Sequence, residues 1–245
     1  MSEEISVRQC TSLEDFGACV ALQREIWREQ DLEVEPATLF VVASHTGGQV
    51  LGAFDGRRLV GFTLALAGLR NSAPYLHSHM TGVHSSCRDR GVGTALKLFQ
   101  RDEALSRNIR LIEWTFDPLE MRNAYFNLNR LGAICRRYLP NLYGITTSPL
   151  HRGLATDRLV AEWYLDSPRV MAALNRELAP AAASCSIEIP ASLEDWKSSD
   201  LRRVQSIQSG IEAKFAEGFA KGYAAISVSK TGSGGAYQLA PWSEF

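Results

Sequence analysis

The 245-residue sequence predicts a mixed α/β fold that combines hairpins with crossover connections. Two apolar runs, residues 50–54 and 59–66, flank Asp55-Gly56, a dipeptide that strongly favours a tight hairpin turn. Later strand-like runs alternate with segments whose apolar residues recur at the period of a helix. The composition changes near Pro168, and the length allows one ordinary domain with a sizeable extension.

Capping and turn residues set the expected bounds of the elements up to residue 83. Ser12 opens a helix, because Asp15 follows three residues later in a capping-box-like arrangement. A short apolar helix ends at Gly47-Gly48, and Pro74 lies in the loop before a third strand. The expected elements are strand 5–10, helix 12–28, helix 37–44, and strands 50–54, 59–66 and 75–83.

Glycine and proline also delimit the elements after residue 83. A glycine-containing turn at residues 88–93 leads into a helix. Asp117 and Pro118 end a short strand and open the next helix, since Pro is favoured at the first helical position, and Gly132 stops that helix. The expected elements are helix 92–107, strand 110–116, helix 119–131, and strands 133–138 and 159–165.

The composition and spacing of the residues after Pro168 differ from those before it and predict a second part of the chain. It has an Ala-rich segment, a short apolar run, a long apolar stripe at helical spacing and a glycine-rich turn. The expected elements are helix 169–183, strand 186–190, a helix from residue 200, and a hairpin of strands 223–229 and 236–239. We expect residues 1–166 to form one domain and residues 167–245 to pack on it as an α/β extension.

Composition and charge argue against several classes of protein. Lys and Arg number 26 against 27 Asp and Glu, a net charge of −1, whereas a general nucleic-acid-binding domain is markedly basic. Five scattered cysteines without a CxxC pair indicate reduced thiols rather than a disulfide framework. The N-terminus has no apolar signal core, and no apolar stretch is long enough to span a bilayer. We therefore expect a cytoplasmic protein that binds neither nucleic acid nor membrane.

The clearest motif is the turn RDRGVGT, residues 88–94, which follows a strand ending at Val83 and opens a helix. Such a turn lets successive backbone N–H groups converge on phosphate oxygens at the positive end of the helix dipole. Arg88 and Arg90 add charge for the same anion. The spacing of Lys97 excludes a P-loop, and no third glycine completes a dinucleotide-binding fingerprint.

This motif resembles the acyl-CoA site of the GNAT superfamily, the acyl-CoA N-acyltransferases. The family has Gln or Arg, then Gly three residues later and Gly or Ala two residues after that, which Arg88, Gly91 and Gly93 match. The later run 123–132, from Asn-Ala to Leu-Gly, resembles the family's looser second motif. The resemblance covers about residues 4–165 and implies a mostly antiparallel central sheet flanked by helices. The chain is similar to a little-characterised subfamily with a C-terminal extension.

The resemblance implies acetyl-CoA or another acyl-CoA as the co-substrate. Backbone amides of the turn would hold the pyrophosphate, and the backbone of the preceding strand would pair with the pantetheine arm like an added strand. Asparagines of the later helix would bind the arm from the other side. Strands 75–83 and 110–116 would splay to form the cleft. The implied cofactor-binding residues are Thr81, Val83, Arg88, Asp89, Arg90, Gly91, Val92, Gly93, Thr94, Asn123 and Asn127.

Acylation of an amine needs a base, for which a carboxylate and two histidines are candidates. Glu113 lies in the middle of a strand, where it is either a desolvated base or half of a structural ion pair. His77 and His79 are expected on one face of their strand with Thr81 and Val83, and each is either a base or a half-buried structural residue. No third ligand follows at metal-site spacing, so we expect no metal.

The proton donor to the leaving thiolate is a second open assignment. The helix position at which the family usually has a Tyr acid is Leu128 here, although a CoA thiolate can also leave with the help of water. Tyr138 and Tyr143 either supply the missing acid or only pack a loop. The acidic run 29–35 either attracts a cationic amine or is a solvated loop.

We therefore predict an N-acetyltransferase that transfers an acetyl group from acetyl-CoA to a small-molecule amine by direct attack in a ternary complex. A covalent acyl-enzyme is not expected, because Cys87 and Cys135 have no His-Asp partners in the motif. One alternative is a non-catalytic acyl-CoA-binding or regulatory protein with a degenerate site. Another is a structural module whose C-terminal part builds a homodimer.

Overall fold

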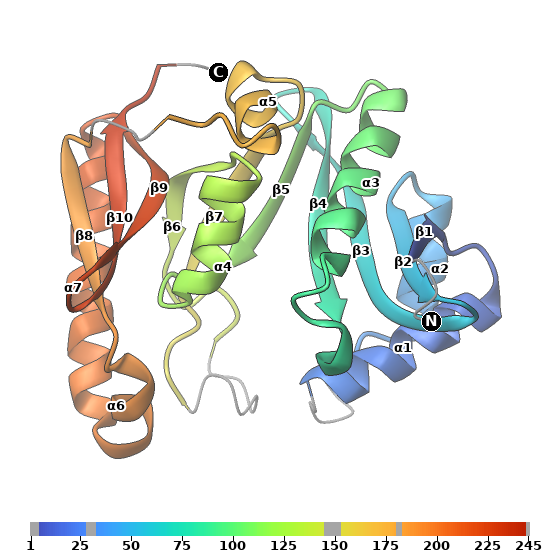
Figure 1. Ribbon diagram of the computed structural model, residues 1–245, viewed down its shortest axis with the longest axis horizontal. Helices are drawn as coiled ribbons and strands as arrows, with labels where there is room; N and C mark the ends of the chain where they lie inside the picture. Colours follow the sequence, from blue (N-terminus) through green and yellow to red (C-terminus); the bar gives the residue numbers. More distant parts are fainter. Residues whose placement is uncertain (1–4, 28–32, 145–152, 180–182, 244–245) are drawn as a thin grey trace. The chain divides into compact units, whose positions relative to one another are not determined.

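The computed structural model describes residues 5–27, 33–144, 153–179 and 183–243 (Figure 1). The chain divides into two compact units, Met1–Glu113 (unit 1) and Trp114–Phe245 (unit 2), and each is described by itself. The predicted division after residue 166 follows a different criterion, the end of the family-like part, and stays a prediction. No helix among the described residues is long and apolar enough to cross a membrane.

Unit 1 is built on strands in the order β1-β2-β3-β4-β5. Neighbouring strands are antiparallel except β4 and β5, which run parallel over the two pairs Leu76↔Ile112 and His77↔Glu113. Strand β5 begins in unit 1 and continues into unit 2. The strands are β1 (Ser6–Gln9), β2 (Gln49–Asp55), β3 (Arg58–Arg70), β4 (Ala73–Val83) and β5 (Leu111–Phe116).

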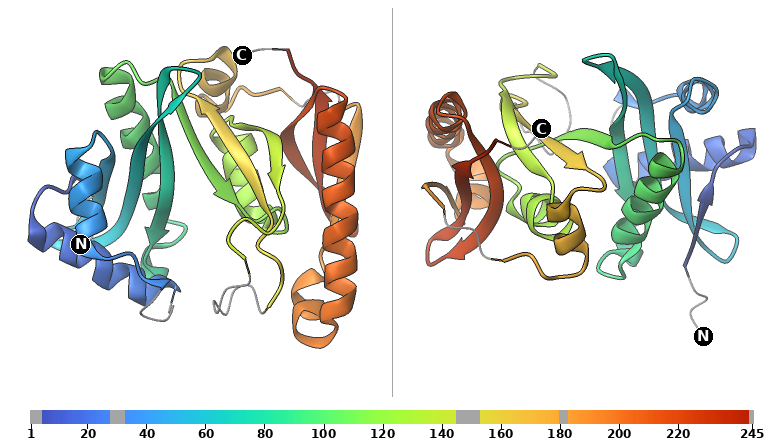
Figure 2. Two further views of the ribbon diagram at one scale, coloured as in Figure 1. Left: turned by 180° about the vertical axis from the view of Figure 1, so that it is seen from behind. Right: turned by 90° about the horizontal axis from the view of Figure 1, so that it is seen from above.

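Helices cover both faces of β2 and β3 (Figure 2). Helices α1 (Leu13–Trp27) and α2 (Ala37–His45) bury a cluster with Phe62 and Leu64 of β3. On the other face, α3 (Val92–Ser106) buries Val92 and Leu96. Each strand alternates its side chains between two apolar layers, which explains why its sequence is apolar almost throughout. The predicted elements of this unit are all present, with bounds that differ by at most four residues.

A β-bulge interrupts the pairing of β3 with β4. Met80 pairs with Leu64 and Ser78 pairs with Ala65, so His79 lies between them without a direct partner on β3. A bulge of this kind inserts one residue and turns the side chains beyond it to the other face.

The bulge corrects the predicted alternation of β4. Ser78 hydrogen-bonds to α3, so the histidines on either side of it face away from α3. A side chain at Gly82 would meet Ile26 and Trp27 of α1, so Thr81 and Val83 face α3. The prediction that these four side chains share one face is therefore wrong, because strict alternation was assumed through a position where one residue is added.

Lys97 lies on the buried face of α3. Its side chain is fully buried and Nζ donates to Ser78 Oγ and Gln100 Oε1, each at 2.9 Å. Burial lowers the pKa of the Lys97 ammonium to about 7. The polar seam between α3 and β4 was not predicted, because Lys at one position of an amphipathic helix usually indicates the solvent face.

Unit 2 is a second set of strands in the order β7-β6-β9-β10-β8, antiparallel wherever the partners are recorded. Its strands are β6 (Ile134–Leu139), β7 (Arg158–Tyr164), β8 (Cys185–Pro190), β9 (Tyr223–Thr231) and β10 (Gly234–Pro241). Its helices are α4 (Met121–Tyr125), the π-helix η3 (Phe126–Arg130), α5 (Pro168–Leu174), α6 (Leu193–Ser199) and α7 (Leu201–Ala220).

Two helices of unit 2 differ from the prediction. Helix α5 ends at Leu174 rather than near residue 183, because Arg176 adopts a left-handed backbone that terminates a helix. Residues 180–182 of the predicted helix lie outside the described residues. Helix α6 was not predicted, since seven residues are too few to show a clear apolar period.

The C-terminal part extends the sheet of unit 2 and holds the helix before it. Cys135 of β6 pairs with Ala225 of β9, and both residues are fully buried. The Asn129 amide donates to Val228 O at 3.2 Å and accepts from Val228 N at 2.9 Å. The Arg169 guanidinium donates to carbonyls of Gly132, Leu128 and Ile226. The residues after 166 therefore share the core of this unit and fix α4 and η3.

Gly132 should be far less tolerant of alanine than Gly222. Both have φ of 76°, which costs a non-glycine residue about 1–2 kcal/mol. At Gly132 a Cβ would also lie 2.9 Å from Ala173 Cβ and 3.0 Å from Val170 Cα, whereas at Gly222 it would meet nothing within 4 Å. Gly132→Ala should therefore cost about 1–3 kcal/mol more than Gly222→Ala. Urea unfolding measures both, and equal costs would contradict the close packing of α5 on Gly132.

Lys97 should make the stability depend on alkaline pH. Its pKa is lowered from 10.5 to about 7, so between these values the unfolded chain holds a proton that the folded chain lacks. The free energy of unfolding should then rise with pH across this window, by about 1.4 kcal/mol per pH unit, and the destabilisation should be complete below pH 7. Lys97→Met should remove this slope and the exposed Lys214→Met should keep it, as denaturant titrations at several pH values will measure. A slope that survives Lys97→Met would contradict the assignment.

Candidate functional site

The turn between β4 and α3 presents an uncapped helix N-terminus (Figure 1). After β4 the chain makes a short 3-10 turn, η2 (Ser85–Cys87), and then bends through Asp89 and Gly91, whose φ values are 62° and 79°. Gly91 is the N-cap residue of α3 and no side chain caps this end. The first N–H groups of a helix have no partner within it, so they remain donors for an anion.

The two arginines of this turn differ in their contacts. Arg90 lies 3.5 Å from Asp55 Oδ2 and donates to Cys87 Sγ, so its charge is partly balanced within the protein. Arg88 is exposed and makes no ion pair with any described residue. Of the two, Arg88 is the one whose charge is fully available to a bound phosphate.

Gly93 has no structural reason to be glycine. Its φ is not positive, and a Cβ added there would meet only Val83 Cγ2, at the ordinary contact distance of 3.9 Å. A Cβ at Gly91 would meet nothing within 4 Å, although its positive φ does require glycine. The space beside both residues therefore leaves the backbone of the turn accessible to a large anion. An open hollow of about 510 Å³, lined by Arg24, Glu25, His84 and Ser85, adjoins the turn.

The strand before the turn has an open edge. Strand β4 is paired with β5 only at Leu76 and His77, so its next six residues have no recorded partner strand on that side among the described residues. The Thr81 hydroxyl is within 3.0 Å of Thr63 Oγ1, and Val83 packs in the α3 cluster. Their side chains are thus engaged within unit 1, which leaves backbone donors and acceptors at the edge for an extended ligand.

His79, the bulged residue, contacts a carboxylate. Its Nε2 lies 2.9 Å from Glu35 Oε1, and about a quarter of the His79 side chain is exposed. The ring of His77 lies 6.4 Å from that of His79, centroid to centroid. His84 is at the turn, where Nδ1 accepts from Ser86 N and Nε2 lies 3.4 Å from Glu25 Oε2.

Glu113 is held in an ion pair on β5. The side chain is almost fully buried and accepts from the guanidinium of Arg70. The carboxylate of Glu113 is therefore engaged in an ion pair, which limits its availability to a substrate amine. The sequence left two roles open for Glu113, a base or half of a structural ion pair, and the structure shows the ion pair.

The helix of unit 2 that carries the two predicted asparagines contains a π-turn. Asn123 in α4 is exposed, whereas Asn127 in η3 is buried and its Nδ2 has no hydrogen-bond partner among the described residues. A buried donor without a partner costs about 1–3 kcal/mol, and π-turns occur often at functional sites. Leu128 is fully buried, so this position supplies no proton donor.

The two candidate tyrosines have different surroundings. Tyr138 in β6 donates to Asp157 Oδ2 at 2.6 Å and stacks on Phe215 of α7. Burial, and next the bond to Asp157, raise the pKa of the Tyr138 hydroxyl, which makes it a poor proton donor to a ligand. Tyr143 is half exposed, and its hydroxyl lies 3.0 Å from Thr115 Oγ1 of β5.

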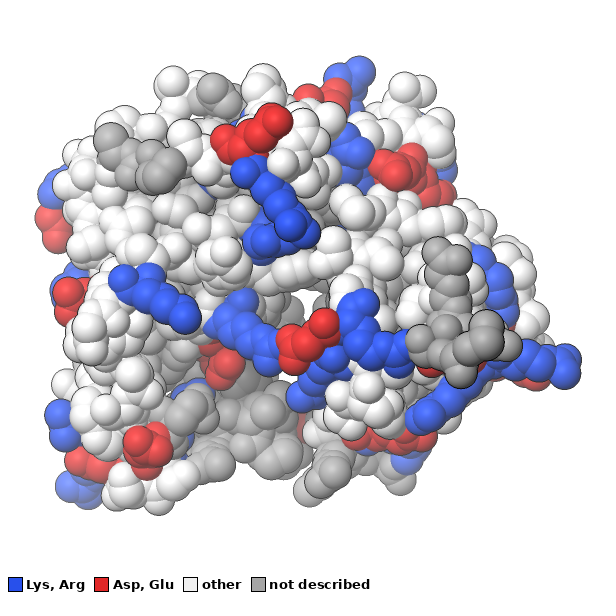
Figure 3. Space-filling model, viewed as in Figure 1, with Lys and Arg blue, Asp and Glu red and all other residues white. Residues whose placement is uncertain are grey.

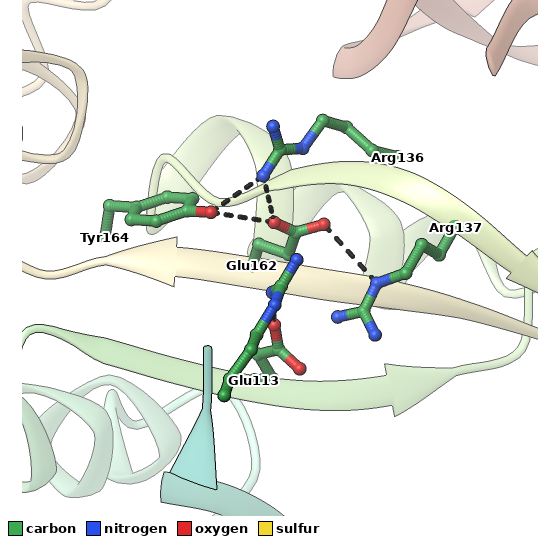
Figure 4. A network of polar contacts seen from close by, with 6 residues as sticks. Glu113, Arg136, Arg137, Glu162 and Tyr164 are labelled. Atoms are coloured by element: carbon green, nitrogen blue, oxygen red, sulfur yellow. Dashed lines mark hydrogen bonds and ion pairs between the residues drawn. The ribbon is translucent and has the colours of Figure 1, made fainter. Parts of the chain in front are cut away.

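A buried carboxylate network in unit 2 was not predicted. Glu162 of β7 has a fully buried side chain, and its Oε2 accepts from Arg136 at 2.6 Å and from the Tyr164 hydroxyl at 2.9 Å (Figure 4). Arg137 lies 3.6 Å from the other carboxylate oxygen. The one signal in the sequence is a lone Glu within an apolar strand, which indicates a buried charge that needs partners.

Charge on the surface agrees with the near-zero net charge. The face drawn in Figure 3 carries both basic and acidic side chains rather than one sign alone. An anion bound at the turn of unit 1 would be held by local backbone donors and Arg88, and such a site would not require a basic protein.

Comparison with solved structures identifies the fold. No family model and no curated protein matches the sequence. The ribosomal-protein-S18-alanine N-acetyltransferase of Escherichia coli matches with a TM-score of 0.54 and 12% identity, over 67% of this chain and 96% of that one. An N-acetyltransferase of Staphylococcus aureus Mu50 gives 0.53 and 14%, over 66% and 99%.

A third similar structure contains a bound acyl-CoA. NAA60 of Arabidopsis thaliana, in complex with acetyl-CoA, has a TM-score of 0.54 and 15% identity, over 66% of this chain and 99% of that one. At such low identity the likeness shows the fold alone, and about one third of this chain lies outside each match. The chain therefore has the GNAT fold, a mostly antiparallel sheet flanked by helices, with further residues added to it.

Proposed function

We propose that the protein is an acyl-CoA-dependent N-acyltransferase that transfers an acetyl group from acetyl-CoA to the amine of a small molecule. One observation carries the proposal. The open edge of β4 leads into an uncapped helix N-terminus whose glycines leave the backbone accessible. An extended chain that ends in a pyrophosphate fits both features at once, and acyl-CoA has this form. The GNAT fold supports the same class of co-substrate.

Different residues of unit 1 would bind different parts of acyl-CoA. The N–H groups of residues 88–94 and the Arg88 guanidinium would hold the pyrophosphate, as the uncapped helix supports. Backbone groups near Thr81 and Val83 would pair with the amides of the pantetheine arm. Of the two asparagines of unit 2, Asn127 with its unpartnered Nδ2 is a better candidate for a ligand contact than the exposed Asn123. No metal takes part in this proposal.

The chemistry is an attack of the neutral amine on the thioester. The C–N bond forms, the C–S bond breaks, CoA leaves as the thiolate, and the amine gives up a proton to a base. His79 is the candidate base that the structure supports best, because it lies beside the open edge and is partly exposed. Glu113 is neutralised by Arg70, so we assign it a structural role.

Tyr143 is the better of the two tyrosine candidates for protonating the thiolate. Its hydroxyl is near Thr115 and the ring is half exposed, whereas the Tyr138 hydroxyl is committed to Asp157. The alternative, a non-catalytic acyl-CoA-binding protein, draws support from Leu128 at the position of the usual Tyr. The five free cysteines support a cytoplasmic location.

Filling the space over the turn should weaken the binding of acetyl-CoA. Gly93→Trp places a large side chain where Gly93 leaves the backbone open, and we expect the Kd to rise at least about tenfold, a loss of about 1.4 kcal/mol. Gly210→Trp is the matched control, because Gly210 lies on α7 in equally open space. Isothermal titration calorimetry measures the Kd for acetyl-CoA of the wild-type protein and of both variants.

Two results would count against the proposed enzyme. Absence of acetyl-CoA binding by the wild-type protein would exclude an acyl-CoA site. Binding without CoA release from any member of a panel of small amines and peptide N-termini would support the non-catalytic alternative. Release with peptides alone would replace the small-molecule acceptor by a protein.

Substitution by leucine should have different effects on the free energy of unfolding at Asn127 and at Asn129. Asn127→Leu removes an unpartnered buried donor, so the free energy of unfolding should stay the same or increase while acetyl-CoA binds more weakly. Asn129→Leu leaves the backbone N–H and C=O of Val228 unpaired and should cost about 1–3 kcal/mol. Thermal unfolding and calorimetry test both. Unchanged affinity of Asn127→Leu would remove Asn127 from the binding site.

A further inference from the structure

We infer that Glu35 is a positioning residue that orients His79 as the base, with Nδ1 as the nitrogen that accepts the proton. This inference rests on the proposed function, because it names how one residue of that site is made ready for the reaction. It starts from one contact, the 2.9 Å between His79 Nε2 and Glu35 Oε1.

The contact fixes which nitrogen of His79 carries hydrogen. A carboxylate is an acceptor only, so the nitrogen that faces it must be the N–H donor. In the neutral ring the other nitrogen then holds the lone pair. Nδ1 of His79 has no hydrogen-bond partner among the described residues, and the side chain is about a quarter exposed. The free nitrogen is therefore available to a ligand.

Both partners are held by the backbone. His79 is the extra residue of the β4 bulge, which turns its side chain to the α1 and α2 side of the sheet. Glu35 precedes Pro36, the N-cap of α2, and a residue before proline is restricted to extended conformations. The carboxylate thus comes from a restrained position at the start of a helix rather than from the middle of a free loop.

The surrounding charges leave Glu35 as the carboxylate in contact with His79. On β4 the nearest titratable group is His77, whose ring centroid is 6.4 Å away. On β5, Glu113 pairs with Arg70. At the end of β4, His84 contacts Glu25 of α1 and Arg58 of β3. Glu113 and His84 therefore have contacts of their own, and among the described residues Glu35 is the carboxylate in contact with His79.

The proton transfer follows from this arrangement. As the amine nitrogen bonds to the acetyl carbon, its proton passes to His79 Nδ1, and the ring becomes an imidazolium that Glu35 stabilises through Nε2–H. The CoA sulfur departs with the electron pair of the C–S bond. The carboxylate touches neither substrate nor co-substrate; it keeps the ring in one orientation and balances the charge that forms on it.

The first arm of the test needs no turnover. In proton NMR spectra, an imidazole N–H that is bonded to a carboxylate gives a downfield resonance protected from exchange with water. We expect this resonance in the wild-type protein and in Glu35→Asp, and its loss in Glu35→Ala and in His79→Gln. Its persistence in Glu35→Ala would overturn the contact. The chain has only five histidines, which makes the assignment tractable.

The second arm measures turnover with acetyl-CoA and the best amine. Glu35→Ala should lower kcat about 10- to 100-fold, less than the full 10²- to 10⁴-fold effect of a general base, and leave the KM for acetyl-CoA unchanged. Glu35→Asp should restore part of the rate. Glu33→Ala is the matched control, since it removes the same charge two residues away and should keep the wild-type kcat.

The outcomes separate the inference from the proposed function. A wild-type protein without turnover on any amine would overturn both. An active wild-type protein with an unaffected Glu35→Ala would overturn the inference alone. If Glu35→Ala and Glu33→Ala both raised the KM for the amine and left kcat unchanged, the acidic segment would act by attracting a cationic acceptor, and the positioning role would be wrong.

Discussion

The short pairing of β4 with β5 is the constraint on which the candidate site depends. Two residue pairs hold the strands together, and β4 then continues for six residues without a recorded partner on that edge among the described residues. An unpaired edge is normally a liability in a sheet, because its N–H and C=O groups seek another strand. Here the open edge leads directly to the uncapped end of α3. A long ligand with amide groups and a pyrophosphate can satisfy both sets of donors.

Charge neutralisation limits which residues can take part in catalysis. Three polar groups that are wholly or partly buried already have partners: Glu113 with Arg70, Tyr138 with Asp157, and Glu162 with two arginines. Such pairing keeps buried charges tolerable, but it also ties up the proton acceptors and donors. His79 differs because its one contact leaves a nitrogen available. The same contact that restrains the ring therefore also selects the atom that can react.

The added C-terminal residues explain how a helix with unusual geometry is held. The π-turn η3 leaves Asn127 with an unpartnered donor, an arrangement that costs stability. Asn129 and Arg169 bind the backbone around this turn and join it to β9. Residues beyond the predicted boundary after residue 166 are part of the folded core of unit 2.

The sequence by itself determined the order of the elements and the glycine-containing turn before α3, which we propose as the phosphate site. Asp55-Gly56, the 3.6-residue periods and the RDRGVGT turn are local signals, since they depend on backbone conformation within a few residues. They predicted nearly every strand and helix and the GNAT resemblance. Local signals fail where an inserted residue breaks the alternation of side chains along a strand, as at the His79 bulge. They also fail where an element is too short to show a hydrophobic period, as in α6.

Only the tertiary structure decided the roles of the polar side chains. A strand sequence says that Glu113 lies between apolar residues, but not that Arg70 reaches it from 43 positions away. In the same way, the segment before Pro36 looked like a solvated acidic loop until folding placed Glu35 against His79. Burial and charge pairing depend on residues distant in the chain, so the choice between a base and a structural ion pair is a property of the packed molecule.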